Sequence, residues 1–142
     1  PPEARIGTWV FEWYWNQPNV PHVAEFVDTV KKATGRVPTA RTWFGFASTW
    51  SCALAAQAAN SLEGVKMAKA LEGMKLPPEI GLMPDQAAFR AEDHQLIGDL
   101  FVGNAQSQGT ADDDFFKVTQ LVKGTDAAPP PAETGCKLTW PA

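Results

Sequence analysis

The chain of 142 residues lacks a long apolar segment, an excess of basic residues and an export signal. Its longest apolar-leaning stretch, residues 52–59, is rich in alanine and broken by Gln57, so it is too short to span a bilayer. The formal net charge of −4 argues against nucleic acid as a partner, because phosphates attract a basic surface. The opening sequence PPEARIGTW has no basic start, apolar core or cleavage site, although a mature exported fragment would lack these too.

Common nucleotide-binding, hydrolase and metal motifs are also absent. The sequence contains no GxGxxG, P-loop or GxSxG pattern, and His22 and His94 do not stand at the HExxH spacing of a zinc site. Residues 112–114 are acidic, but they lack the alternating ligands, central Gly and terminal Glu of a calcium loop. We therefore expect no cofactor and no metal, and we interpret residues 112–114 as the first turn of a helix.

The apolar periodicity predicts a mixed α/β chain. Residues 5–11 are rich in β-branched and aromatic side chains, as a strand is, and residues 22–34 carry an apolar stripe at helical spacing that Gly35 closes. Further helices are expected at residues 42–59, 62–72 and 115–122, strands at residues 80–83, 87–90 and 96–105, and an extended segment at residues 127–132.

This order of elements does not close into a complete parallel sheet. A parallel strand needs neighbours that are joined to it by right-handed crossovers, and only one clear strand–helix unit is present. The segments after residue 80 are antiparallel in character. We infer that residues 5–11 form the last strand of a sheet whose other strands lie upstream, so that the chain is a fragment.

Three segments together carry a resemblance to a known family. They are FEWYW at residues 11–15, TGRVPTARTW at residues 34–43 and FRAEDHQ at residues 89–95. With the helix between the first two, they resemble the C-terminal part of a type I periplasmic solute-binding protein of an ABC importer. The nearest group is the branched-chain amino acid and aromatic acid binding proteins.

The resemblance implies a fold of two Rossmann-like lobes joined by crossover strands and closing on a small solute. Residues 1–36 would belong to the C-terminal lobe, the helices in residues 37–79 would pack on the N-terminal lobe, and residues 80–142 would hold crossover strands, a short helix and the tail. The implied function is capture of a carboxylate-bearing solute in the periplasm and its delivery to an ABC permease, without chemistry. The implied partners are the solute, the permease and the N-terminal portion of the same protein.

The aromatic residues after the first strand form the first candidate site. Ligands of open α/β sheets bind at the carboxyl ends of strands, and Trp13, Tyr14 and Trp15 lie at such an end. Strand alternation would place Trp13 and Trp15 on one face and Tyr14 on the other. Core packing accounts for each residue equally well. The resemblance favours a stacking wall of a solute pocket.

The start of the long helix forms the second candidate site. Arg41 stands at a helix N-terminus, where its charge opposes the helix dipole, so helix propensity does not account for it. A solvent-exposed arginine is the simpler interpretation. The resemblance implies instead that Arg41 clamps a ligand carboxylate and that Trp43 or Phe44 stacks on an aromatic ring.

Two further pairs of residues leave alternatives open. Asp93 and His94 suggest a small α/β hydrolase, but no Ser or Cys nucleophile stands in a recognisable motif, and we expect no enzyme activity. A ligand-sensing receptor module of the same fold is another alternative. Cys52 and Cys136 are compatible with one disulfide or with two free thiols.

Overall fold

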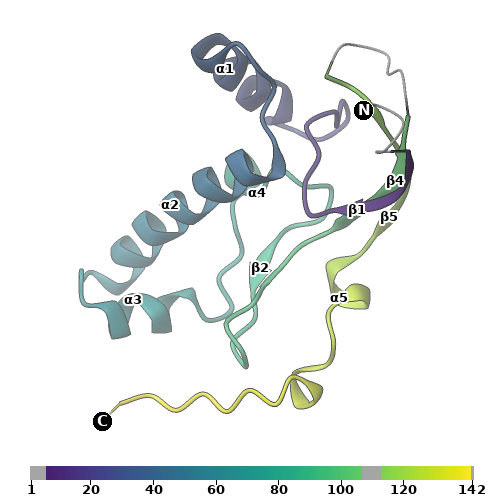
Figure 1. The fold of residues 1–142 in the computed structure, drawn as a ribbon. Helices are drawn as coiled ribbons and strands as arrows, with labels where there is room; N and C mark the ends of the chain where they lie inside the picture. Colours follow the sequence, from purple (N-terminus) through teal and green to yellow (C-terminus); the bar gives the residue numbers. More distant parts are fainter. Residues whose placement is uncertain (1–5, 107–112, 142) are drawn as a thin grey trace.

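The computed structural model describes residues 6–106 and 113–141. Figure 1 shows helices on one side of the molecule, a twisted sheet on the other, and a C-terminal tail that runs back below them toward α3. The helices are α1 (Val23–Thr34), α2 (Ala40–Ala59), α3 (Gly64–Leu71), α4 (Pro78–Gly81) and α5 (Gly124–Ala127), with a 3-10 turn η2 at Pro131–Glu133. The strands are β1 (Gly7–Phe11), β2 (Ala88–Phe89), β3 (Leu96–Ile97), β4 (Leu100–Ala105) and β5 (Phe116–Val122).

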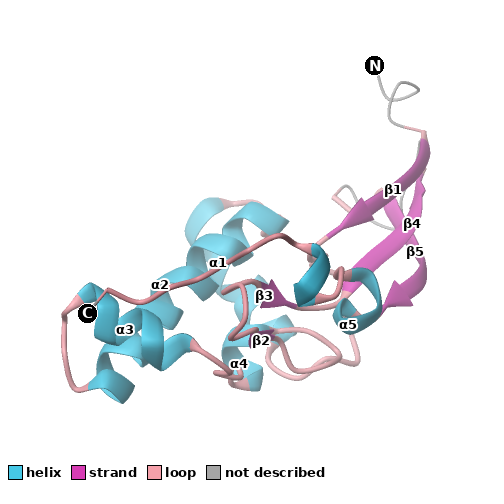
Figure 2. Ribbon diagram, turned by 90° about the horizontal axis from the view of Figure 1, so that it is seen from below, coloured by secondary structure: helices cyan, strands magenta, loops and turns pink. Residues whose placement is uncertain are grey.

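The main sheet is antiparallel and has the strand order β1-β4-β5, so β4 is its central strand. In Figure 2 these three strands stand together at one end, while β2 and β3 form a separate small hairpin near the helices. Gly103 in β4 sits where a side chain cannot fit, because a Cβ there would lie 2.2 Å from the carbonyl oxygen of Lys117 in β5. That close approach coincides with a register shift between Val102 and Gly103.

Both long helices follow the sequence prediction. α1 ends at Thr34, and Gly35 then adopts a left-handed conformation with φ 74° that suits glycine. α2 begins slightly before residue 42 because Thr39 and Thr42 form a reciprocal capping box at its start. The capping box fixes where the chain turns into α2, which is the segment next to the strand end of β1.

The core is organised around two stacked tryptophans. The rings of Trp13 and Trp43 lie parallel, with an interplanar angle of 5° and centroids 6.4 Å apart, and both side chains are 1% exposed. Each indole N–H donates to a backbone carbonyl at the end of α4: Trp13 to Leu82 at 2.9 Å and Trp43 to Gly81 at 3.0 Å. Buried indoles therefore have both their apolar area and their donor satisfied.

This core joins residues from two of the expected segments. Val23 and Val27 of α1 belong to the same buried cluster as Trp43 and Ala47 of α2 and the residues around α4. The part of residues 1–36 that follows β1 therefore packs as one unit with residues 37–79 in this structure. Their assignment to separate lobes of a larger protein stays a prediction.

Two predicted elements were wrong. Residues 80–83 do not form a strand: Pro78 starts the short helix α4, and Leu82 then turns left-handed with φ 50°. Residues 115–122 do not form a helix but contain β5, in which buried Phe116 is followed by exposed Lys117, half-buried Val118 and exposed Thr119. That period of two is the strand signal. Asp112 lies outside the described residues.

Two other predictions needed smaller corrections. The strand expected at residues 96–105 is split into β3 and β4 by Gly98 and Asp99, and the buried Asp99 carboxylate accepts from the Asp85 amide at 2.9 Å. The segment 127–132, expected to be extended, begins at the end of α5 and enters η2. Residues 90–95, the polar part of the segment FRAEDHQ, form the turn between the antiparallel strands β2 and β3, and Phe89 itself belongs to β2.

Among the described residues, no helix is both long enough and apolar enough to cross a membrane.

The tryptophan stack yields a stability prediction. We expect Trp43→Ala to lower the free energy of unfolding by about 3–5 kcal/mol, because it removes a fully buried ring and leaves a cavity. Trp50→Ala, on the same helix but 48% exposed, should cost no more than about 1 kcal/mol. Urea unfolding followed by circular dichroism measures both variants, and equal losses would contradict a core centred on Trp43.

Candidate functional site

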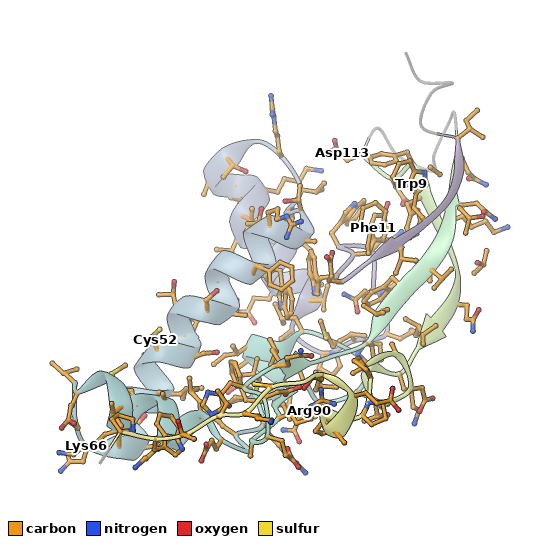
Figure 3. All side chains as sticks on the ribbon, turned by 60° about the horizontal axis from the view of Figure 1, so that its bottom comes forward. Trp9, Phe11, Cys52, Lys66, Arg90 and Asp113 are labelled. Carbon is orange, nitrogen blue, oxygen red and sulfur yellow. The ribbon has the colours of Figure 1, made fainter. Side chains whose placement is uncertain are left out.

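The aromatic strand end and the start of α2 enclose a pocket of about 220 Å³. Phe11, Tyr14 and Trp15 form its wall on the β1 side, and residues 36–40 form the side that leads into α2. Asp113 and Phe115, which lead into β5, complete the lining. Figure 3 shows Phe11 and Asp113 near one another at the sheet end of the molecule. The pocket is therefore built from three segments that are far apart in the sequence.

Tyr14 is buried against the inner face of the sheet. Its ring meets the Phe116 ring edge-on, with centroids 5.2 Å apart. Its hydroxyl donates to Asp114 Oδ1 at 2.7 Å and accepts from the Phe116 amide at 3.4 Å. Burial, and then the neighbouring Asp114 carboxylate, raise the pKa of the Tyr14 phenol far above its ordinary value. Tyr14 is therefore a neutral hydrogen-bond donor throughout the physiological range.

Trp15 lies between the core cluster around Trp13 and Trp43 and a second buried cluster, which is formed by Tyr14, Phe101 and Phe116. It is half-buried, packs against both clusters, and its ring centroid lies 6.0 Å from that of Tyr14. Its indole N–H points to the Asp113 carbonyl at 3.4 Å. Part of the Trp15 ring thus stays available to a molecule in the pocket.

The arginine that borders the pocket is Arg36, not the predicted Arg41. Arg36 is exposed and contributes to the lining. Arg41 is also exposed, but its guanidinium lies over the Phe44 ring, 5.6 Å from the centroid, one turn further along α2. Such a stack accounts for Arg41 without a ligand. Phe44 is half-buried and lines a separate pocket of about 100 Å³ together with Glu12 and Asp99.

Trp13 is among the residues that line the pocket, whereas Trp43 is not and lines the separate pocket beside Phe44. With 1% of each side chain exposed and both indole N–H groups bonded to α4 carbonyls, they form the core beneath the site. The strand alternation expected through residue 15 also fails, because β1 ends at Phe11. Tyr14 consequently joins Phe11 in one cluster, while Trp13 turns into the other.

The two cysteines are free and exposed in the structure, so the disulfide alternative is not realised. Figure 3 shows Cys52 on α2, well away from the sheet that carries Phe11. Cys136 lies in the C-terminal tail.

Asp93 and His94 do not form a catalytic pair with each other. The Asp93 carboxylate accepts from Arg90 Nε at 2.9 Å, and this hydrogen bond to Arg90 lowers the pKa of Asp93. His94 Nε2 lies 3.0 Å from Glu72 Oε1, an oxygen that also accepts from the Trp140 indole at 3.1 Å. These contacts tie the hairpin turn to α3 and to the tail.

Their position also separates them from the pocket. Figure 3 shows Arg90 far from both Phe11 and Asp113. The geometry therefore gives the hydrolase alternative no support. Within the described ranges, no three His, Cys, Asp or Glu side chains converge as a metal site requires.

Sequence reasoning missed Arg36, Asp113 and Asp114 as residues of the site. Arg36 stands inside the TGRVPTARTW segment, next to the glycine that ends α1, and that position was the available signal. The two aspartates were interpreted as a helix start, so nothing in their pattern connected them with Tyr14.

Comparison with known proteins identifies a family model that covers most of the chain. The model, described as periplasmic binding protein, matches residues 2–110. An amino acid ABC transporter substrate-binding protein from Pseudomonas fluorescens Pf-5 is similar in structure, with a TM-score of 0.79 and 21% identity, over 97% of this chain and 36% of that one. No curated protein matches the chain.

Two further solved structures come from Rhodopseudomonas palustris. An ABC-type branched-chain amino acid transporter from strain CGA009 has a TM-score of 0.70 and 21% identity, over 88% of this chain and 33% of its own. A solute-binding protein of an ABC transporter from strain BisB5, in complex with 3,4-dihydroxybenzoic acid, has a TM-score of 0.70 and 16% identity, over 86% and 32%. The chain thus spans about one third of the length of these structures.

The environment of Tyr14 yields a titration prediction. Tyr14 is the only tyrosine, so tyrosinate absorbance reports on it alone. We expect no ionisation near pH 10 in the folded chain and ordinary ionisation near about pH 10 in denaturant. Since the folded pKa is the raised one, the stability that the neutral phenol contributes is present below pH 10 and is lost as pH rises further. Ionisation near pH 10 in the folded chain would contradict the buried Tyr14–Asp114 bond.

Proposed function

This chain belongs to the periplasmic binding protein family, and we propose that it forms part of the solute-binding component of an ABC transporter. The mixed α/β structure and its solved neighbours agree with the type I fold of that family. In this proposal the protein captures a solute in the periplasm and passes it to a permease without altering it. The neighbours named as transporter substrate-binding proteins support that role.

The observation that carries the proposal is the aromatic pocket at the end of β1. Solute sites are concave and mainly apolar, with a few polar groups that fix orientation. The pocket has this composition: it is lined by the aromatic residues Phe11, Trp13, Tyr14, Trp15 and Phe115 and by the charged residues Arg36 and Asp113. Its volume of about 220 Å³ suits a small solute.

The chemistry of the pocket supports a carboxylate-bearing solute. Arg36 offers a charged donor fork that pairs with a carboxylate, and the exposed part of Trp15 offers a face for an aromatic or branched apolar group. Two solute classes meet these requirements: aromatic acids, such as the 3,4-dihydroxybenzoic acid bound by one neighbour, and branched-chain amino acids.

We further propose that the rest of a two-lobe polypeptide covers the exposed side of β1 and of α2. β1 is an edge strand without a charged residue, and Trp9 and Val10 are 49% and 55% exposed. The opposite edge strand, β5, exposes Lys117, Thr119 and Gln120, as an edge that faces water does. In α2, Arg41 is the sole charged residue, although one side of the helix is exposed.

Solute binding is tested by isothermal titration of the whole polypeptide that contains this chain with 4-hydroxybenzoate and with leucine. We expect one of them to bind, and Arg36→Gln to weaken that binding by about 10- to 100-fold, the worth of a hydrogen bond to a charged group. Arg41→Gln is the matched control and should change the affinity less than about 2-fold, since Arg41 lies over Phe44 outside the pocket. Binding of neither probe would contradict the proposal, and a larger effect of Arg41→Gln would move the site to the outer face of α2.

The proposed polypeptide partner is tested by mass. Protein purified from its natural source should have a native mass about three times that of this chain of 15.4 kDa, because the chain spans about one third of its structural neighbours. Denaturing mass spectrometry then shows whether that mass is one polypeptide or two. A lone species of 15.4 kDa that binds solute would contradict the two-lobe proposal.

A further inference from the structure

Asp114 places a buried carboxylate just before β5. Its side chain is buried, with only 8% of the residue exposed. Oδ1 accepts from the Tyr14 hydroxyl at 2.7 Å, and Oδ2 accepts from Asn16 Nδ2 at 2.9 Å. A buried carboxylate is costly unless donors satisfy it, and these two bonds supply donors to both of its oxygens.

These bonds connect two segments that the sheet does not connect. Tyr14 and Asn16 follow β1, whereas Asp114 precedes β5, and both of those strands pair with β4 but not with each other. The neighbouring bond from the Trp15 indole to the Asp113 carbonyl, at 3.4 Å, joins the same two segments. Their relative position therefore depends on these side-chain bonds as well as on the pairing of each strand with β4.

The two connected segments are the two sides of the candidate pocket. Tyr14 and Trp15 line it from the β1 side, and Asp113 and Phe115 line it from the β5 side. We propose that Asp114 is a positioning residue of this pocket: its carboxylate holds the aromatic wall against the segment that leads into β5 and so sets the pocket's width. This inference rests on the proposed solute-binding function, which it extends to a residue that does not contact the solute.

The role requires a carboxylate and not merely a polar side chain. Both partners of Asp114 act as donors, so both of its oxygens must accept. An asparagine has the same shape but one acceptor, and its amide would face a second donor. Asp113 offers a matched control in the adjacent position, because its side chain is exposed and the bond to Trp15 uses its backbone carbonyl.

The test is a double-mutant cycle with Asp114→Asn and Tyr14→Phe. Isothermal titration with 4-hydroxybenzoate and leucine should show about a 10-fold weaker affinity for Asp114→Asn than for the unaltered chain. In the Tyr14→Phe background the same substitution should cost about 3-fold or less, because the principal partner is already gone. Equal losses in both backgrounds would mean a general structural role and would overturn the proposal.

A second readout separates this proposal from the proposed function. Hydrogen exchange at residues 14–16 and at the Phe116 amide should quicken in Asp114→Asn and stay unchanged in Asp113→Asn. The ionisation of Tyr14 in Asp114→Asn should also move back toward its ordinary pH, since the carboxylate beside the phenol is removed. If no probe binds but these shifts occur, the solute-binding function fails while Asp114 still positions the two segments. If neither exchange nor ionisation changes, the positioning role is wrong whatever binds.

Discussion

The arrangement of this chain depends on the stack of Trp13 on Trp43. The stack joins the segment that leaves β1 to the first turns of α2, and both indole N–H groups hold the end of α4 in place. Because Trp13 is held by this stack, the next two residues, Tyr14 and Trp15, are held in place as well. The stack therefore sets the position of the aromatic side of the pocket. A structure in which two core residues are immediate sequence neighbours of a site allows little movement between core and site.

The outer surface of α2 and of β1 carries apolar residues that nothing in the structure covers. α2 has apolar or small residues around most of its circumference, which is typical of a helix buried on more than one side. β1 likewise presents Trp9 and Val10, while the opposite edge strand β5 exposes three polar residues and one apolar residue, Leu121. Both uncovered surfaces fit a chain about one third as long as its structural neighbours, in which further polypeptide would cover them.

Sequence patterns predicted the two long helices correctly, because their helical signals are strong. They failed where the same apolar residues fit both the helical period of 3.6 and the strand period of two. Gly35 and the apolar stripe before it located α1, and the alanine-rich segment located α2. Residues 115–122 suit either period when only their apolar members are counted, and the decisive feature is the polar alternation at Lys117 and Thr119. Residues 80–83 are apolar enough for a strand, but Pro78 in the first turn of a helix outweighs that preference.

The site was predictable only in part, because the fold brings its lining residues together from three segments that are far apart in the sequence. The aromatic cluster at residues 13–15 is visible in the sequence, yet which ring faces the pocket depends on β1 ending at Phe11, and no local residue marks that end. Arg41 was preferred to Arg36 because a helix N-terminus draws attention to it, whereas the proximity of Arg36 to the pocket follows from the path of the chain between α1 and α2.

The positions of the charged residues around the pocket bear on which solutes it can bind. The Asp114 carboxylate accepts hydrogen bonds from Tyr14 and Asn16. The raised pKa of the Tyr14 phenol keeps that donor protonated, so Asp114 bonds to residues of the protein itself. Arg36 and Asp113 remain as exposed charges on different segments of the rim. An anion that met both equally would gain little, since attraction to one offsets repulsion by the other. A solute with its carboxylate toward Arg36 and a hydroxyl or ammonium donor toward Asp113 satisfies both, and hydroxylated aromatic acids and amino acids share that polarity.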